Sequence, residues 1–258
     1  MSELPLSVVM IAFNEEDNIT RCLSSLPNHC EVVVLDSGSS DSTKRIAIEW
    51  GAIVAERPFD DYASQRNHAA TLAHRDWLLV VDCDEVLSPE LRGFLEQNLS
   101  DINAAYDRES VTAYRIRRRL WFMGKLLRFG KTEDAPIRLF RRQSGQYQGK
   151  VHEVFTPETG MVSNIQQGHL THYSYVDLQD YFFRFNRYTS MIAEKHGDAG
   201  RRTWLATAYL RMLWEFFSRM ILRLAWLDGW QGIVFASLSS GYAFVKYLKL
   251  YEQNRARQ

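Results

Sequence analysis

The chain has 258 residues, 46% hydrophobic and 24% charged, so it can bury a substantial core and is too apolar for a disordered protein. Its 31 basic and 31 acidic residues balance, yet residues 1–107 hold 19 acidic and 7 basic side chains while residues 108–150 hold 3 and 12. No nucleic-acid-binding module or continuous basic block is present, so we expect no nucleic-acid partner. Three cysteines without C-x-x-C spacing indicate a reduced compartment, and the first residues lack the features of a signal peptide.

Strand and helix patterns alternate along the first 81 residues. Continuous apolar runs predict four strands, at 6–13, 31–36, 52–55 and 77–81. Apolar residues at helical spacing predict the intervening helices. One begins near Asn14, another ends at Trp50 and a third covers 62–74. This alternation indicates an α/β fold with a mainly parallel sheet. Neither G-x-G-x-x-G nor G-x-x-x-x-G-K-[ST] occurs, which argues against a standard dinucleotide fold and a P-loop NTPase.

The stretch from Trp77 to Glu85 is the centre of the predicted site. Its apolar residues run without alternation, as in a strand buried on both faces, and Asp82 and Asp84 follow. Because side chains along a strand repeat every two residues, we expect both carboxylates to point to the same side. Paired carboxylates at the carboxyl end of a buried strand suit a hard divalent cation that also binds phosphate oxygens. The alternative is a solvated turn before the helix that begins near Ser88.

Polar side chains also end the other predicted strands. Asn14 and Glu15 follow the first strand, and Asp36 ends the second. At this sheet edge such groups can bind a ribose, a base edge or a metal without a glycine-rich loop. The alternative role of Asn14 and Asp36 is to cap the helices that follow them, and the two roles can coexist.

Four segments in this order carry a resemblance to a known family. They are Ala12–Glu16, Asp36–Thr43, Gln65–Asn67 and Asp82–Glu85. Together they resemble family 2 glycosyltransferases, which are inverting enzymes with a GT-A fold that use nucleotide-sugar donors. One departure is Ala12, where the family often has proline.

The resemblance implies a role for each of these residues. The residues that it places around the nucleotide sugar are Ala12, Asn14, Glu15, Asp36, Ser37, Arg66 and Asp82. Arg66 would lie near the base or the pyrophosphate, and Asp82 near the ribose and the metal. Asp84 would be the main ligand of a divalent metal, Mg²⁺ or Mn²⁺. His172 could complete the metal or pyrophosphate site, or could be a buried structural histidine.

The second half of the chain resembles one subgroup of this family. Alternating patterns predict strands at 110–119 and 135–142, with an aromatic and basic loop or hairpin at 120–130 near the acceptor. The segments that carry the likeness are RLFRR (138–142), VHE (151–153), GHLTHYSY (168–175) and LDGWQG (227–232). They resemble the lipopolysaccharide core β-1,4-glucosyltransferases of Gram-negative bacteria.

An inverting transfer needs a general base for the acceptor hydroxyl. The resemblance places a carboxylate at Glu153, which is our candidate, and Asp134 is the second candidate. The alternative for Glu153 is a surface side chain paired with Lys150 or Arg142.

The C-terminal quarter has a different pattern. Between Trp204 and Trp226 apolar residues recur at helical spacing, while arginines and a glutamate recur every four residues on another face. Such a helix suits a membrane interface. The uncharged stretch Gly229–Val245 has 17 residues, fewer than the ~20 of a spanning helix, which favours peripheral attachment. The alternative is a soluble helical hairpin, packed on the catalytic domain or forming a homodimer interface.

These observations combine into one hypothesis. We expect a GT-A domain over 1–200, with nucleotide-sugar binding in 1–107 and the acceptor and catalytic part in 108–200, and a helical membrane-associating or dimerising region over 201–258. The resemblance implies a UDP-sugar donor, UDP-glucose, and a lipid-borne saccharide acceptor, a heptose of the lipopolysaccharide inner core. The enzyme would work at the cytoplasmic face of the bacterial inner membrane. Alternatives are a polyprenyl-phosphate or other surface-polysaccharide glycosyltransferase, and a non-catalytic nucleotide-sugar-binding protein.

Overall fold

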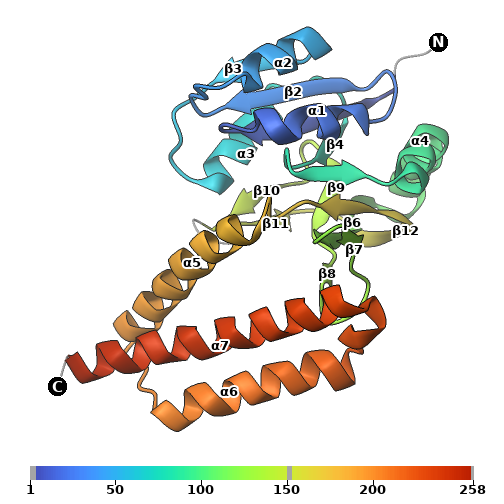
Figure 1. The fold of residues 1–258 in the computed structure, drawn as a ribbon. Helices are drawn as coiled ribbons and strands as arrows, with labels where there is room; N and C mark the ends of the chain where they lie inside the picture. The colour runs from blue at the N-terminus through green and yellow to red at the C-terminus, as the bar shows by residue number, and fades with distance from the viewer. Residues whose placement is uncertain (1–3, 150–152, 257–258) are drawn as a thin grey trace. The chain divides into compact units, whose positions relative to one another are not determined.

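The structure is a computed structural model that describes residues 4–149 and 153–256 (Figure 1). Contacts between Cα atoms divide the chain into two compact units. The first comprises residues 1–118 and 134–172, and the second comprises residues 119–133 and 173–258. The predicted functional division at residue 200 stays a prediction, because these units are defined by contacts alone.

The first unit begins with the predicted alternation of strands and helices. Its elements up to the centre of the site are β1 (Leu6–Ala12), α1 (Glu16–Ser24), β2 (Glu31–Asp36), α2 (Thr43–Trp50), β3 (Ile53–Glu56), α3 (Tyr62–Thr71) and β4 (Trp77–Val80). The four strands pair in parallel in the order β3-β2-β1-β4. Ala12 pairs with Asp36 and Val9 with Val80, so the carboxyl ends of β1, β2 and β4 share one edge. The predicted α/β fold is confirmed.

The sheet continues beyond β4 with strands from the second half of the chain. These elements are β5 (Glu85–Leu87), α4 (Pro89–Glu109), β6 (Val111–Phe122), β8 (Glu133–Asp134), β9 (Ile137–Arg141), β10 (Gly145–Gln148), β11 (Val154–Pro157) and β12 (Met161–His172). The order is β4-β9-β6-β12-β5, and β9 pairs antiparallel with both β4 and β6. β10 and β11 form a separate antiparallel hairpin. The sheet is therefore parallel in its first half, while its second half is built from antiparallel pairs.

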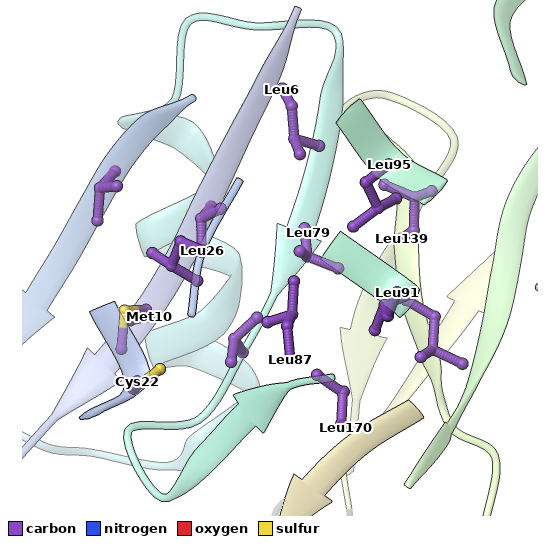
Figure 2. Close-up of a cluster of buried hydrophobic side chains, with 14 of the residues drawn as sticks. Leu6, Met10, Cys22, Leu26, Leu79, Leu87, Leu91, Leu95, Leu139 and Leu170 are labelled. Atoms are coloured by element: carbon purple, nitrogen blue, oxygen red, sulfur yellow. The ribbon is translucent and has the colours of Figure 1, made fainter. Parts of the chain in front are cut away.

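Both faces of the parallel half are covered, which explains the continuous apolar runs. Trp77 and Leu79 pack on one face with apolar residues of α1, α2 and α4, and Leu78 and Val80 pack on the other with α3. Figure 2 shows the first of these clusters, where Leu79 lies among side chains from neighbouring elements. Each fully buried leucine contributes about 1.5–3 kcal/mol to folding. Burial of this kind fixes the strand ends that carry the site.

Two local predictions need correction. Asn14 does not cap α1: Glu15 is at the N-cap position without a side-chain cap, and Asn14 has a left-handed φ of 55°. The backbone N–H groups of Glu15 and Glu16 instead donate to Thr43 Oγ1 (2.8 Å) and Asp41 Oδ2 (3.1 Å), so the neighbouring loop supplies the acceptors. β4 ends at Val80 and residues 82–85 form a turn, so the two-residue strand repeat does not orient the carboxylates. The helix predicted to begin at residue 88 runs as far as Glu109.

The second unit is mainly helical. Its elements are β7 (Lys125–Leu126), α5 (Leu178–Asp198), α6 (Leu205–Phe217), the short π-helix η1 (Ser218–Leu222), the short 3₁₀-helix η2 (Ala225–Asp228) and α7 (Trp230–Ala256). β7 forms a hairpin with the end of β6, as predicted for residues 120–130, and α5 and α6 pack against α7 (Figure 1). The helical pattern from Trp204 to Trp226 is interrupted after Phe217, and Leu224 has a φ of 54°. Within 4–149 and 153–256, no helix combines the length and apolar character needed to cross a bilayer.

Candidate active site

The loops after β1 and β2 are joined by hydrogen bonds between the residues of two sequence motifs. Ser37 N donates to Ala12 O (2.9 Å), Asn14 N to Ser39 Oγ (2.9 Å), and Ser40 N to Asn14 Oδ1 (2.9 Å). An asparagine tolerates the left-handed backbone that this arrangement requires. These contacts give the motif residues a structural role, and their predicted contacts with the nucleotide remain predictions.

Asp36 closes the turn that follows β2. Its Oδ1 accepts from the backbone N–H groups of Gly38 (2.9 Å) and Ser39 (2.7 Å), and its Oδ2 accepts from Ser39 Oγ (2.5 Å). The side chain is fully buried. A ribose contact by Asp36 stays a prediction, and it would require one of these bonds to be shared.

Three consecutive residues of α3 hold three different segments. Gln65 is fully buried and donates through Nε2 to the carbonyls of Arg57 (3.1 Å) and Pro58 (3.0 Å). Arg66 reaches the end of β4. Asn67 binds the backbone of Tyr147 with both ends of its amide, since Nδ2 donates to Tyr147 O (2.9 Å) and Oδ1 accepts from Tyr147 N (2.8 Å). The Gln65-Arg66-Asn67 motif therefore ties α3 to the loop after β3, to β4 and to the β10–β11 hairpin.

Asp82 lies between two arginines. Its Oδ1 accepts from Arg66 Nη2 (2.7 Å) and its Oδ2 from Arg138 Nη2 (2.7 Å), and both arginine side chains are 6% exposed. Burial alone would raise the pKa of Asp82, but Arg138 and Arg66 outweigh it and hold that pKa far below its usual range. Each oxygen accepts one of these hydrogen bonds and keeps a second lone pair, and the predicted role of Asp82 as a metal ligand stays a prediction.

The ion pairs continue across the antiparallel half of the sheet. Glu85, fully buried, accepts through Oε1 from Arg138 Nη2 (2.6 Å) and from Arg118 Nη1 (3.0 Å). Arg118 in turn donates to both oxygens of Asp134, at 2.6 and 2.9 Å. Asp134 is 57% exposed, so this last pair is close to solvent.

At the other end of the same chain of charges is Glu153. Its Oε1 accepts from Arg66 Nε at 3.2 Å, and its side chain is 18% exposed. The alternative partners considered from the sequence were Lys150, which lies outside the described residues, and Arg142, which donates to Ala73 O. Both candidate bases therefore belong to one network, in the order Glu153, Arg66, Asp82, Arg138, Glu85, Arg118, Asp134.

Asp84 and His172 form a second, smaller pair. Antiparallel pairing of β5 with β12 sets His172 opposite Glu85, and His172 Nε2 lies 3.2 Å from Asp84 Oδ2. Burial lowers the pKa of His172, but the hydrogen bond and charge of Asp84 outweigh it and raise that pKa above its usual value. No group of three or more His, Cys, Asp or Glu that could hold a metal occurs among the described residues. A converging carboxylate and imidazole nevertheless fit an ion whose other ligands are substrate phosphates and water.

The sequence motifs included Asn67, Glu85 and Arg138 without indicating their partners, and Arg118 was not singled out. A signal for Arg138 exists, because it lies within an otherwise apolar strand whose neighbours Ile137 and Leu139 are buried. A charged residue at such a position implies a buried partner. Phe13 lies in the segment that was predicted to bind the nucleotide and is 58% exposed, and the sequence indicated no role for it.

The fold, with acidic and amide side chains at the carboxyl ends of its parallel strands, is that of a known class of enzyme. Residues 7–159 match the model of glycosyl transferase family 2, and the chain belongs to this family. It is 30% identical, over 98% of its length and 94% of the relative, to the lipopolysaccharide core biosynthesis glycosyltransferase LpsC of Rhizobium meliloti (strain 1021). It is 27% identical, over 95% of its length and 85% of the relative, to an uncharacterized glycosyltransferase of Rickettsia typhi (strain ATCC VR-144 / Wilmington).

Among solved structures, the crystal structure of S. aureus TarS is similar over 95% of this chain and 54% of the TarS chain, with 16% identity and a TM-score of 0.47. The predictions of a family 2 glycosyltransferase near the lipopolysaccharide core subgroup, and of its GT-A fold, are confirmed.

The buried network predicts a large stability effect at Arg138. Arg138→Met leaves Asp82 paired with Arg66 alone and Glu85 paired with Arg118 alone. The buried network then lacks one compensating positive charge, a loss that typically costs about 3–5 kcal/mol. The measurement is the free energy of unfolding in urea. The control is Arg45→Met on α2, whose partner Glu49 is 3.0 Å away and 62% exposed, and which we expect to lose less than about 1 kcal/mol. Equal losses in the two variants would contradict the assigned role of the network.

Proposed function

We propose that this family 2 enzyme is an inverting, metal-dependent glycosyltransferase that moves glucose from UDP-glucose to a heptose of the lipopolysaccharide inner core. The observation that carries the proposal is the pairing of a partly exposed carboxylate, Glu153, with a network that leads directly to the Asp82–Glu85 turn. The name of the relative LpsC, a lipopolysaccharide core biosynthesis glycosyltransferase, supports lipopolysaccharide core biosynthesis as the process. Donor and acceptor sugars are inferred from the subgroup that the sequence resembles.

In the proposed reaction Glu153 accepts the proton of the acceptor hydroxyl. The acceptor oxygen forms a bond to the anomeric carbon as the bond from that carbon to the diphosphate oxygen breaks, and the nucleoside diphosphate leaves with the electron pair. Asp84 and His172 would hold a divalent ion, Mg²⁺ or Mn²⁺, which supplies positive charge for the leaving diphosphate. Attack from the side opposite the leaving group inverts the configuration.

The contacts of the two candidate bases favour Glu153. Both oxygens of Asp134 accept hydrogen bonds from Arg118, whereas within 4–149 and 153–256 Glu153 contacts Arg66 alone, through one oxygen at 3.2 Å. Two parallel hydrogen bonds to one guanidinium fix the Asp134 carboxylate and occupy both of its oxygens. Asp134 therefore fits a structural role at the edge of the network.

The proposed function is tested by deleting the gene in its host and analysing the lipopolysaccharide core by mass spectrometry. We expect the core to lose one hexose, wild-type enzyme to restore it, and Glu153→Gln to fail, since loss of a general base costs about 10²–10⁴-fold in rate. Asp134→Asn is the matched control and should restore the hexose. An unchanged core in the deletion strain would refute the acceptor, and restoration by Glu153→Gln would move the base to Asp134.

The metal site is tested by binding of UDP. Asp84→Ala removes the carboxylate of the proposed pair, so the part of UDP affinity that depends on Mn²⁺ should fall by about tenfold or more. Isothermal titration calorimetry with Mn²⁺ and with EDTA measures this part directly. Asp76→Ala removes a carboxylate that is 66% exposed, and we expect it to bind like the wild type. UDP binding by Asp84→Ala as tight and as Mn²⁺-dependent as before would refute the site.

We further propose that the second unit attaches the enzyme peripherally to the cytoplasmic face of the inner membrane. The face of α6 that was predicted to be apolar partly packs on α7, as in the contact of Tyr209 with Phe244. A second apolar stripe is exposed and comprises Leu210 (67%), Leu213 (60%), Trp214 (55%), Phe217 (47%) and Ile221 (54%). An exposed apolar stripe of this size marks an interaction surface. Residues 201–258 also hold 9 basic and 3 acidic side chains, which suits anionic lipid more than a second copy with the same charge.

Membrane attachment predicts a two-part salt response. Binding to anionic liposomes should weaken in high salt as the basic residues are screened, without vanishing, because apolar burial is insensitive to salt. Alkaline carbonate should release the protein. Leu210→Glu with Leu213→Glu should reduce binding by about tenfold or more in co-sedimentation. The control is Ile48→Glu on α2, also 61% exposed but in the first unit. Dimerisation without liposome binding would favour a homodimer interface instead.

A further inference from the structure

Arg66 is shared by two acidic residues with different roles. Its Nη2 donates to Asp82 at 2.7 Å and its Nε donates to Glu153 at 3.2 Å. Its Nη1 is buried and has no hydrogen-bond partner among the described residues. The guanidinium also lies over the ring of Tyr147, 5.5 Å from the centroid. One planar cation thus contacts the proposed base and a carboxylate of the proposed donor site.

The two contacts of Arg66 differ in how firmly they are held. Asp82 is fixed from its other side by Arg138 at 2.7 Å, and its backbone N donates to Glu85 Oε2 at 3.1 Å. Glu153 precedes β11 and lies outside regular secondary structure, and among the residues that the structure describes its hydrogen-bond partner is Arg66 alone. The Arg66–Asp82 contact is therefore the permanent one, and the contact with Glu153 is the one that a ligand can replace.

The carboxylate of Glu153 occupies a place where Arg66 can receive an anion. Arginine binds carboxylate and phosphate oxygens through the same fork of donors. Asp82 and Asp84 lie on one turn, so their Cα atoms are at most about 7 Å apart. A diphosphate bound at Asp84 and His172 through a divalent ion would reach the guanidinium that Asp82 anchors if it extends along this turn toward Asp82. On the basis of the proposed function, we propose that the donor diphosphate and the Glu153 carboxylate compete for Arg66.

This competition gives Arg66 a second role, which is to make the base available only when the donor is bound. Without donor, the contact with Arg66 occupies one oxygen of the Glu153 carboxylate. With donor, the diphosphate takes the contact with Arg66 and Glu153 turns toward the acceptor. The enzyme would then bind the donor before it can activate the acceptor hydroxyl.

The test compares the affinities of wild type and Glu153→Gln for two ligands, UDP and uridine, by calorimetry in saturating Mn²⁺. Glutamine lacks the charge that competes, so UDP should bind about two- to fivefold more tightly, the range expected for a partly exposed ion pair. Uridine has no diphosphate, so its affinity should be unchanged. Glu158→Gln changes the net charge equally at an exposed residue beyond β11 and should bind both ligands like the wild type.

A double-mutant cycle separates competition from repulsion through space. In an Arg66→Gln background the Glu153→Gln change should no longer tighten UDP binding, because nothing remains to compete for. If Arg66→Gln does not fold, as judged by thermal unfolding, Arg66→Lys replaces it; a lysine lacks the fork, and the effect should shrink.

The outcomes are distinct. UDP binding by Glu153→Gln that is unchanged or weaker overturns the inference, and so does equal tightening for uridine or in the Arg66 variants. The proposed function survives these results, since the base and metal roles do not depend on competition. Failure of the wild type to bind UDP at all would instead refute the proposed donor, and the inference with it.

Discussion

The carboxylate of Asp82 lies between the guanidinium groups of Arg66 and Arg138, and each of its oxygens accepts one hydrogen bond. Taking three ionised groups out of water is costly unless every charge is paired, and removing one partner leaves the others uncompensated. The cluster therefore fixes α3, the end of β4 and β9 in one relation, because a displacement of any of them would separate buried charges. Stability and site geometry depend on the same contacts here.

The network also joins the two halves of the sheet. Alternation of four carboxylates with three arginines carries it from Glu153 to Asp134 and leaves one net negative charge. That sign suits a site that we propose to hold a cation as well as an anionic donor. The hydrogen bonds between the loops after β1 and β2 keep the remainder of the edge in place without using any charge of the network.

The sequence predicts the parallel half of this fold well, for a physical reason. Strands buried on both faces must be apolar throughout, so β1, β2 and β4 are visible as continuous runs, and parallel pairing brings their polar ends to one edge.

What the sequence does not show is which later strands lie beside β4. Arg138 follows Asp82 by 56 residues and meets it through the antiparallel pairing of β9, which no local pattern encodes. The prediction that Asn14 caps α1 was wrong for a similar reason, because the acceptors for the first backbone N–H groups of that helix come from another loop. The interruption after Phe217 is not visible in helical spacing either.

Asn67 binds the β10–β11 hairpin in the way that a neighbouring strand would, through the backbone N–H and carbonyl of Tyr147 alone. A contact made to the main chain does not depend on which side chains the hairpin carries. Gln146 and Gln148 are exposed on the same strand and can be exchanged without loss of this attachment. The hairpin that leads toward Glu153 can thus diverge in sequence while this proposed base keeps its distance from α3. A family could alter its choice of acceptor in this way, leaving the machinery for the sugar donor untouched.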